Sequence, residues 1–272
     1  MEAKKDKIIS VKNFTASYGE TVVLDNISFD VNHGEVFVIL GGSGCGKSTL
    51  LKHMIGLYEP VAGEIFIDGN DIVGAEGDER KKILNKIGVM FQSGALFGSM
   101  TLLENVRLEL EEYTDLPKDA MDLIAMMKLE LVGLREFADY MPSELSGGMQ
   151  KRAAIARAMV MDPKILFLDE PSAGLDPVTS ADLDQLIVNL ARSLKMTFVI
   201  VTHELPSVFA VADTVIMLEK QVKKIVATGT PDQLQQNEDN PWVWQFFHRS
   251  VNIKAGDKLH AVLDGEETNK KE

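Results

Sequence analysis

A glycine-rich loop joins an apolar strand to a helical run in the segment Val36-Phe-Val-Ile-Leu40-Gly41-Gly-Ser-Gly-Cys-Gly46-Lys47-Ser48. The loop consists of a glycine, four further residues and then Gly-Lys-Ser, which is the spacing of a phosphate-binding loop. Its glycines let successive backbone N–H groups face an anion, and the start of the helix adds the positive end of its dipole. We expect Lys47 to reach the terminal phosphates of a nucleotide and Ser48 to bind Mg²⁺.

The alternative for this loop is a glycine-rich turn that binds nothing. It is disfavoured because the strand, the spacing and the helix occur together. The residues predicted to contact the nucleotide here are Gly41, Gly42, Ser43, Gly44, Cys45, Gly46, Lys47, Ser48 and Thr49. Cys45 is the only cysteine. A helix N-terminus can favour its thiolate, so a redox switch is the alternative to a small residue that happens to be cysteine.

Two carboxylates follow another apolar strand. Residues 165–168 lead directly into Asp169 and Glu170, and ligands of open α/β sheets bind at the carboxyl ends of strands. We predict that Asp169 holds Mg²⁺ through water and that Glu170 is the general base towards the attacking water. Solvated acids at an exposed strand end are the alternative, which the phosphate-binding loop disfavours. The two motifs together predict an ATPase that uses Mg²⁺.

A second possible anion site begins at Ser146, where Ser146-Gly147-Gly148 leads into a basic helix. Ser146 can cap that helix, and the two glycines leave its first N–H groups open to a phosphate. The first loop already holds the triphosphate of its own copy. The second site is therefore expected to face the nucleotide of another copy of the chain.

The remaining pattern indicates an α/β fold. Several strand-like runs are apolar throughout, which is typical of a parallel sheet covered by helices on both faces. The predicted strands cover residues 8–14, 27–31, 36–40, 64–67, 88–91, 165–168, 197–201 and 214–218. The predicted helices cover residues 47–55, 102–113, 117–132, 146–161, 177–194 and 206–212. The helices between residues 102 and 161 form a helical insert.

The composition excludes some classes of function. The chain has 272 residues and a formal net charge of −13, so bulk electrostatics disfavour binding to nucleic acid or anionic lipid. Its apolar runs are far shorter than the roughly 18 residues that span a bilayer, and its start lacks the apolar run of a secretory signal. We expect a cytosolic protein that reaches a membrane only through a partner.

From about residue 8 to residue 229, this order of motifs resembles the nucleotide-binding subunit of an ABC transporter. The resemblance implies a P-loop NTPase of ABC type, with a RecA-like parallel sheet core, an N-terminal antiparallel β subdomain and a helical insert. It also implies a permease dimer in the membrane and a head-to-tail homodimer of ATPase subunits. In that homodimer the Lys47 loop of one copy and the Ser146 loop of the other hold each ATP.

The resemblance also implies roles for single residues. Tyr18 is similar to the aromatic residue that stacks on adenine, Gln92 to the glutamine that senses Mg²⁺ and the attacking water, and His203 to the histidine that contacts the γ-phosphate. Residues 172–176, which end at Asp176, resemble the loop that meets the partner subunit beside its nucleotide. Gly42 departs from the family, which very often has proline there.

A finer resemblance points to the ATPases of the Mla and Mce lipid-transport systems. It rests on Phe91-Gln-Ser-Gly-Ala-Leu-Phe97, Met126-Met-Lys-Leu-Glu130, Val132-Gly-Leu-Arg135, Met141-Pro-Ser-Glu-Leu145 and Gln245-Phe246. It implies phospholipid moved between the inner and outer membranes to maintain outer-membrane lipid asymmetry. It further implies accessory lipid-binding subunits and a place on the cytoplasmic face of the inner membrane. The runner-up is the ATPase of an amino-acid or other small-solute importer.

The expected organisation is an ABC ATP-binding domain over residues 1–236, with a helical subdomain over about 93–161, and a C-terminal tail over 237–272. The aromatic tail residues either pack on their own domain or dock a second subunit; they are Trp242, Trp244, Phe246 and Phe247. Two other classes remain, a DNA-repair or chromosome-organising ATPase and a module that binds ATP without cleaving it. The acidic charge disfavours the first, and the presence of Glu170 and His203 disfavours the second.

Overall fold

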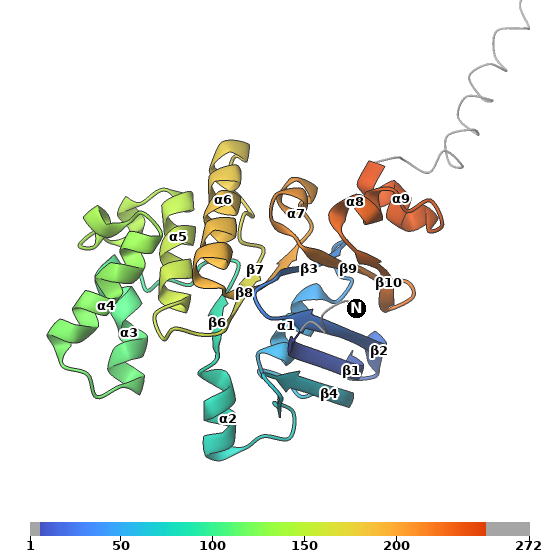
Figure 1. The fold of residues 1–272 in the computed structure, drawn as a ribbon, viewed down its shortest axis with the longest axis horizontal. Helices are drawn as coiled ribbons and strands as arrows, with labels where there is room; N and C mark the ends of the chain where they lie inside the picture. Colours follow the sequence, from blue (N-terminus) through green and yellow to red (C-terminus); the bar gives the residue numbers. More distant parts are fainter. Residues whose placement is uncertain (1–5, 249–272) are drawn as a thin grey trace, which may run out of the picture. The chain divides into compact units, whose positions relative to one another are not determined.

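The computed structural model of this chain describes residues 6–248. Its contacts divide the chain into two units, Met1–Pro231 and Asp232–Glu272. The first unit carries two β-sheets, the helices that cover them and a helical insert (Figure 1). The motifs predicted from the sequence to bind nucleotide all lie in this unit.

Four antiparallel strands form the sheet nearest the N-terminus, in the order β2-β1-β4-β5. Their bounds are β1 (Lys7–Tyr18), β2 (Thr21–Asn32), β4 (Ala62–Ile67) and β5 (Asn70–Asp71). In the middle of the sheet, Ile9 pairs with Val31 on one side and with Ile67 on the other, and all three are buried. The predicted N-terminal antiparallel subdomain is confirmed.

Six strands form the second sheet, in the order β10-β9-β3-β8-β7-β6. Their bounds are β3 (Val36–Gly41), β6 (Ile87–Met90), β7 (Ile165–Asp169), β8 (Thr197–Thr202), β9 (Thr214–Glu219) and β10 (Lys224–Gly229). All neighbours are parallel except β10, which pairs antiparallel with β9 at the edge. Every residue of β3, β7 and β8 is buried, which explains why these strands are apolar except at the ends of β7 and β8. The predicted parallel core is confirmed.

Helix α1 (Lys47–Met54) links the two sheets through a shared core. Its buried residues Leu50 and Met54 belong to the same apolar cluster as Phe14 of β1 and Phe167 of β7. The helix begins directly after the glycine-rich loop that follows β3. The packing of α1 therefore holds that loop at the carboxyl edge of the parallel strands.

The helical insert lies beside β6 and contains three helices (Figure 1). They are α3 (Leu102–Tyr113), α4 (Lys118–Leu131) and α5 (Gly147–Ala158). Thr101 and Glu104 form a capping box at the start of α3, and Ser146 caps α5 by accepting from the N–H of Met149. Two short 3-10 turns, Arg135–Phe137 and Pro142–Glu144, connect α4 to α5. After the insert, the helices α6 (Pro177–Leu194) and α7 (Leu205–Val211) alternate with the last parallel strands.

Some elements differ from the sequence prediction. β1 and β2 are longer than predicted because they pair as one long hairpin that closes between Tyr18 and Thr21. Helix α5 ends at Ala158 rather than at residue 161. Helix α2 (Gly77–Leu84) was not predicted, because Ile83 is its only buried residue and leaves no apolar period.

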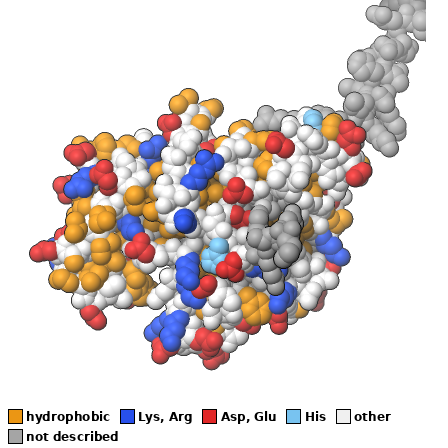
Figure 2. All heavy atoms as spheres, in the orientation of Figure 1, with side chains coloured by type: hydrophobic (Ala, Val, Ile, Leu, Met, Phe, Trp, Pro, Cys, Tyr) orange, Lys and Arg blue, Asp and Glu red, His pale blue; other side chains and the backbone are white. Residues whose placement is uncertain are grey.

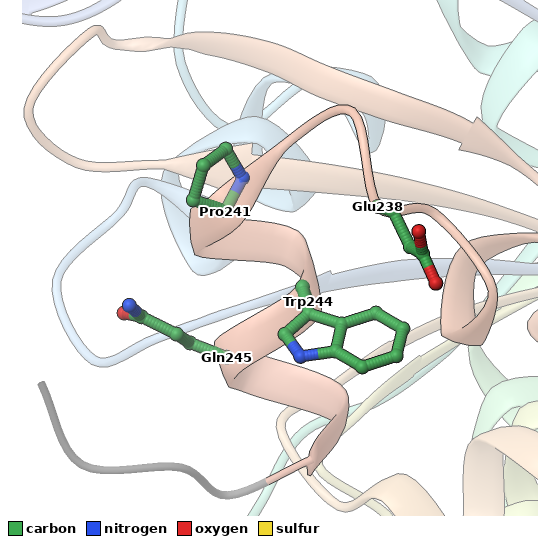
Figure 3. A pocket seen from close by; sticks show the side chains of 4 residues that line it. All are labelled: Glu238, Pro241, Trp244 and Gln245. Atoms are coloured by element: carbon green, nitrogen blue, oxygen red, sulfur yellow. The ribbon is translucent and has the colours of Figure 1, made fainter.

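The second unit contains the aromatic segment as a helix. Helix α8 (Pro231–Gln235) begins at the unit boundary and is followed by α9 (Pro241–His248). Asn240 caps α9 by accepting from the N–H groups of Trp242 and Val243. Glu238, Pro241, Trp244 and Gln245 line a pocket, and Figure 3 shows the Trp244 ring on the side of α9 that faces Glu238. Residues 249–272 of the predicted C-terminal tail lie outside the described residues.

Among residues 6–248, no helix has both the length and the apolar character that crossing a membrane requires.

Candidate active site

The glycine-rich loop is held tightly on two sides. A Cβ added to Gly41 would lie 2.6 Å from the carbonyl oxygen of Leu218 on β9, and one added to Gly46 would lie 2.9 Å from Cγ of Leu24. Gly46 also has a φ of 101°, which residues with a Cβ rarely adopt. Lys47 opens α1, and its Nζ donates to the carbonyls of Gly41 (2.9 Å) and Gly42 (3.2 Å). The loop therefore curls around the ammonium group of its own lysine.

Ser48 and Asp169 come together at the carboxyl edge of the sheet. Ser48 lies on the first turn of α1 and its hydroxyl donates to Oδ1 of Asp169 across 3.4 Å. Burial, and then the negative charge of Glu170, raise the pKa of Asp169. A buried carboxylate next to a second one and to a hydroxyl offers the oxygen ligands that Mg²⁺ prefers, and Mg²⁺ commonly binds one or two carboxylates together with substrate phosphates. The pair fits the predicted magnesium site.

Glu170 has an unusual backbone and one unpaired oxygen. Its φ is 47°, and its N–H donates to the carbonyl of Val201 on β8. Oε1 lies 2.8 Å from Nδ1 of His203 and 3.9 Å from Nζ of Lys47. Oε2 is buried and has no hydrogen-bond partner among the described residues. A buried acceptor without a partner is costly, and here it is free to accept from a water molecule, as the predicted general base must.

Tyr18 lies beside the same helix. Its hydroxyl lies 3.3 Å from Oγ1 of Thr49, the residue is 53% exposed, and its ring meets Tyr58 edge to face. An exposed ring beside the start of α1 fits the predicted stacking on adenine. Four contacts gather the predicted site residues: Tyr18 with Thr49, Ser48 with Asp169, and Glu170 with both His203 and Lys47. Residues 47–49 are consecutive, as are 169 and 170, so the four contacts share two short segments of the chain.

Gln92 follows the end of β6, and its backbone is held by the insert. Lys151 donates from Nζ to the carbonyl of Gln92, and Arg157 donates to the carbonyls of Gly94 and Ala95 at 2.9 and 2.7 Å. These two cations of the basic helix were not predicted to do this. The sequence predicted only that the helix after Ser146 is basic, and the structure shows that both side chains are buried against their own chain.

Gly147 and Gly148 lie against the start of α6 and the loop before it, since a Cβ added to Gly147 would lie 3.5 Å from Cδ2 of Leu175 in that loop. A Cβ added to Gly148 would lie 2.3 Å from Cγ2 of Thr179. Asp176 caps α6, accepting from the N–H groups of Val178 and Thr179 at 3.1 Å. The predicted contact of Asp176 and the Ser146 turn with a second nucleotide stays a prediction.

A buried polar network behind these loops was missed from the sequence. Ser172 donates to Oε2 of Glu204 (2.9 Å) and lies 3.4 Å from the hydroxyl of Ser207. Ser207 in turn bonds Asp184, whose pKa is raised to about 6 by burial and by the charge of Glu204. The available signal was Asp184 itself, an acid between the buried positions Leu183 and Ile187 of an amphipathic helix.

Cys45 does not fit a redox switch. The side chain is 2% exposed, and burial raises the pKa of its thiol despite the nearby charge of Lys47. Thiolate reactivity needs a lowered pKa and access. The structure therefore favours the interpretation of Cys45 as a small residue packed within the loop.

The family model described as ABC transporter matches residues 24–173, a span that includes the Lys47 loop, the Ser146 turn and both acids of the site. The chain belongs to the ABC transporter family. As a member of this family of ATPases, it binds and hydrolyses ATP.

Relatives of known description share this cassette over most of their length. The chain is 42% identical over 232 residues to the intermembrane phospholipid transport system ATP-binding protein MlaF of Haemophilus influenzae, covering 85% of this chain and 87% of that protein. MlaF of Escherichia coli K12 is 42% identical over 247 residues, which is 91% of each chain. The "Probable ribonucleotide transport ATP-binding protein mkl" of Mycobacterium leprae is 43% identical over 240 residues, covering 88% of this chain and 68% of that protein.

Solved structures of ABC cassettes share the fold. A dimeric ATP-binding cassette in a post-hydrolysis state, bound to ADP and Pi, superposes with a TM-score of 0.74 at 33% identity and covers 82% of this chain and 98% of that one. The cbiO1 protein of Clostridium perfringens, part of the ABC transporter complex cbiONQ, reaches a TM-score of 0.78 at 30% identity and covers 95% of this chain and 100% of that one.

Proposed function

We propose that this chain is the ATP-hydrolysing subunit of a bacterial ABC transporter that moves phospholipid between the inner and outer membranes and so maintains outer-membrane lipid asymmetry. The observation that carries the catalytic part is Glu170, a buried carboxylate between His203 and Lys47 with Oε2 left unpaired. The lipid cargo rests on 42% identity to MlaF proteins across 85% and 91% of the chain.

The contacts support a role for each site residue within one subunit. Lys47 and the loop from Gly41 to Ser48 would hold the phosphates, with the N–H groups of the loop supplying donors. Ser48, Asp169 and Gln92 would hold Mg²⁺, which when bound neutralises charge on the phosphate oxygens. Glu170 accepts a hydrogen bond from the attacking water through Oε2 and is oriented by its contact with Nδ1 of His203.

A second copy of the chain completes the site. The Ser146 turn opens helix α5, and the N–H groups of Gly147 and Gly148 at its start have no partner within the helix, so the turn can bind a phosphate of the facing copy. It packs against the loop that ends at Asp176, which the family resemblance places at the partner subunit. A dimeric cassette at 33% identity supports this head-to-tail homodimer. Closure on two ATP molecules and opening after hydrolysis would drive the transporter.

The membrane partner is an integral permease dimer, which this subunit meets through its helical insert. Figure 2 shows hydrophobic side chains gathered over the part of the surface that α3 and α4 occupy in Figure 1. The exposed apolar residues of α3, α4 and the segment between them include Tyr113, Leu116, Leu123, Met127 and Leu131. Exposed apolar groups of this size support contact with a partner. The subunit would then sit on the cytoplasmic face of the inner membrane, with accessory lipid-binding subunits in the same complex.

Other cargoes are less well supported. An amino-acid or other small-solute importer would share the catalytic residues, but it would not require similarity to MlaF through the insert. The name of the M. leprae relative suggests a ribonucleotide cargo, but the alignment covers only 68% of that protein. The decisive measurement is the lipid content of the purified complex, compared with transport of labelled phospholipid and labelled small solutes in vesicles. Solute transport without lipid transfer would refute the lipid cargo.

The ATPase assignment has a test of its own. Glu170→Gln is expected to lower phosphate release about 100-fold or more in the complex, because general-base catalysis contributes that much, while ATP still binds and traps dimers. Lys47→Ala is expected to abolish nucleotide binding. Undiminished turnover by Glu170→Gln would remove Glu170 from the role of base.

A further inference from the structure

Helix α5 contacts two parts of the ATP machinery at different points along its length. Its N-terminus is the Ser146 turn, and its side chains Lys151 and Arg157 hold the backbone of the loop that carries Gln92. We infer that Lys151 and Arg157 are positioning residues. When the nucleotide of the facing subunit binds the Ser146 turn, these two residues determine the position of Gln92 in the ATP site of their own subunit. The inference rests on the proposed function, because only in a head-to-tail dimer does the Ser146 turn meet a second nucleotide.

The contacts run from buried cations to main-chain carbonyls. Lys151 is 8% exposed and donates to the carbonyl of Gln92, while Arg157 is 9% exposed and donates to Gly94 and Ala95. Hydrogen bonds from charged donors are shorter and stronger than those between neutral groups, and the planar guanidinium fixes two neighbouring carbonyls at once. The position of Gln92 is therefore tied to α5 as well as to the strand before it.

The loop is strained at the point that these cations hold. Ala95 has a φ of 49°, a region that residues with a Cβ seldom adopt unless their surroundings impose it. Gly94 lies against the same helix, since a Cβ added to it would be 3.4 Å from Cβ of Ala154. A displacement of α5 would therefore reach the loop by direct packing as well as through the hydrogen bonds of Arg157.

Helix α5 is suited to transmit such a displacement. Its residues 153–158 are all buried, and closely packed helices move as units because protein interiors compress little. Lys151 lies five residues after Ser146, which corresponds to about 7.5 Å along the helix axis. A phosphate that draws the Ser146 turn towards the facing copy would also draw the carbonyl of Gln92.

The first test removes the ammonium group while keeping most of the side-chain volume. In the complete complex, Lys151→Met is expected to speed amide hydrogen exchange in the peptide covering residues 92–96 about tenfold, because it deletes one hydrogen bond from a charged donor. It is also expected to lower kcat about tenfold and to change KM for ATP less than about twofold. Lys151→Arg keeps a cation and is expected to bring both the exchange rate of residues 92–96 and kcat most of the way back to the wild-type values. Wild-type exchange and an unchanged kcat would overturn the inference.

The matched control is Lys128→Met. Lys128 is another lysine of the insert with a mostly buried side chain, but its ammonium pairs with Asp162 instead of a loop carbonyl. Its substitution is expected to leave exchange in residues 92–96 and the kcat unchanged. If Lys151→Met does not fold, Arg157→Lys replaces it, because lysine keeps the charge but cannot bond two carbonyls in a fork. An equal effect of Lys128→Met would reduce the role of Lys151 to stability and overturn the inference.

The coupling between the two ATP sites of the dimer is tested in the Glu170→Gln variant, in which ATP-bound dimers are expected to accumulate. ATP is expected to slow exchange in residues 92–96 when Lys151 is present and to leave it unchanged in the Lys151→Met double variant. If dimers form and exchange responds equally in both proteins, the coupling is overturned while the proposed function stands. If ATP forms no dimers at all, the proposed function falls and the inference with it.

Discussion

Replacing Asp184 with asparagine is expected to stabilise the folded protein at neutral pH, although the change removes a charge from a hydrogen-bonded network. Asp184 is 5% exposed on α6 and has a pKa raised to about 6 from 3.8, by burial and by the charge of Glu204. Ser207 bonds the carboxyl, and the side-chain carbonyl of an asparagine can accept the same bond. The substitution therefore removes the buried charge and keeps the acceptor.

The magnitude follows from linkage between protonation and folding. Each tenfold change in acidity corresponds to about 1.4 kcal/mol, so a folded pKa near 6 makes ionised Asp184 unfavourable by about 3 kcal/mol relative to the unfolded chain. Between pH 4 and pH 6 the folded state binds more protons than the unfolded state, so stability decreases as the pH rises through that window. Above pH 6 the loss is complete. Asp184→Asn has no such loss.

The assay is urea unfolding of both proteins at several pH values from 4 to 8. The free energy of unfolding of Asp184→Asn minus that of the wild type is expected to be small near pH 4 and to rise to about 3 kcal/mol at pH 7. The matched control is Asp182→Asn, because Asp182 lies on the same helix and is exposed. A difference that stays constant across the pH range would refute the reasoning, since it would mean that Asp184 titrates alike in both states.

Two further predictions come from close contacts and a third from burial. Gly148→Ala is expected to lower ATP turnover at least about tenfold, because the new Cβ would lie 2.3 Å from Cγ2 of Thr179 and overpacking costs about 1–3 kcal/mol. Adding Thr179→Ser deletes the methyl group Cγ2 and is expected to restore turnover. Gly88→Ala is expected to destabilise the protein by at least about 3 kcal/mol in urea unfolding, because the new Cβ would lie 2.0 Å from the carbonyl oxygen of Ala158. Iodoacetamide at pH 8 is expected to modify Cys45 at least about tenfold more slowly in the folded protein than in urea, because the thiol is buried and its pKa is raised; equal rates would contradict this.

The parallel core and the Lys47 loop could be predicted because their signals are local. Residues 36–48 contain the strand, the turn and the helix start within one short segment, and residues 165–170 contain the strand and both acids. Fully buried strands have an apolar character that needs no knowledge of their neighbours. The sequence alone therefore predicted which residues lie at the carboxyl edge.

The contacts that hold the loops in place could not be predicted, because they join residues far apart in the chain. Lys151 and Gln92 are 59 positions apart, and Ser172 and Glu204 are 32 apart. A lysine or arginine near a possible anion site suggests a phosphate ligand, and only the fold shows that it is buried against a carbonyl. Helix α2 was missed for a different reason, since an element with one buried residue has no apolar period.

The adjacent acids also show how a strand end can deliver two carboxylates to one site. Successive residues of a strand point to opposite faces, so Asp169 and Glu170 in a regular strand would diverge. The strand β7 instead ends at Asp169, and Glu170 turns to a φ of 47°, held by its N–H bond to the carbonyl of Val201. A left-handed residue with a Cβ costs roughly 1–2 kcal/mol. That cost brings Glu170 to Lys47 and His203 while Asp169 remains with Ser48, so the strain is part of how this fold builds a base and a metal ligand from consecutive residues.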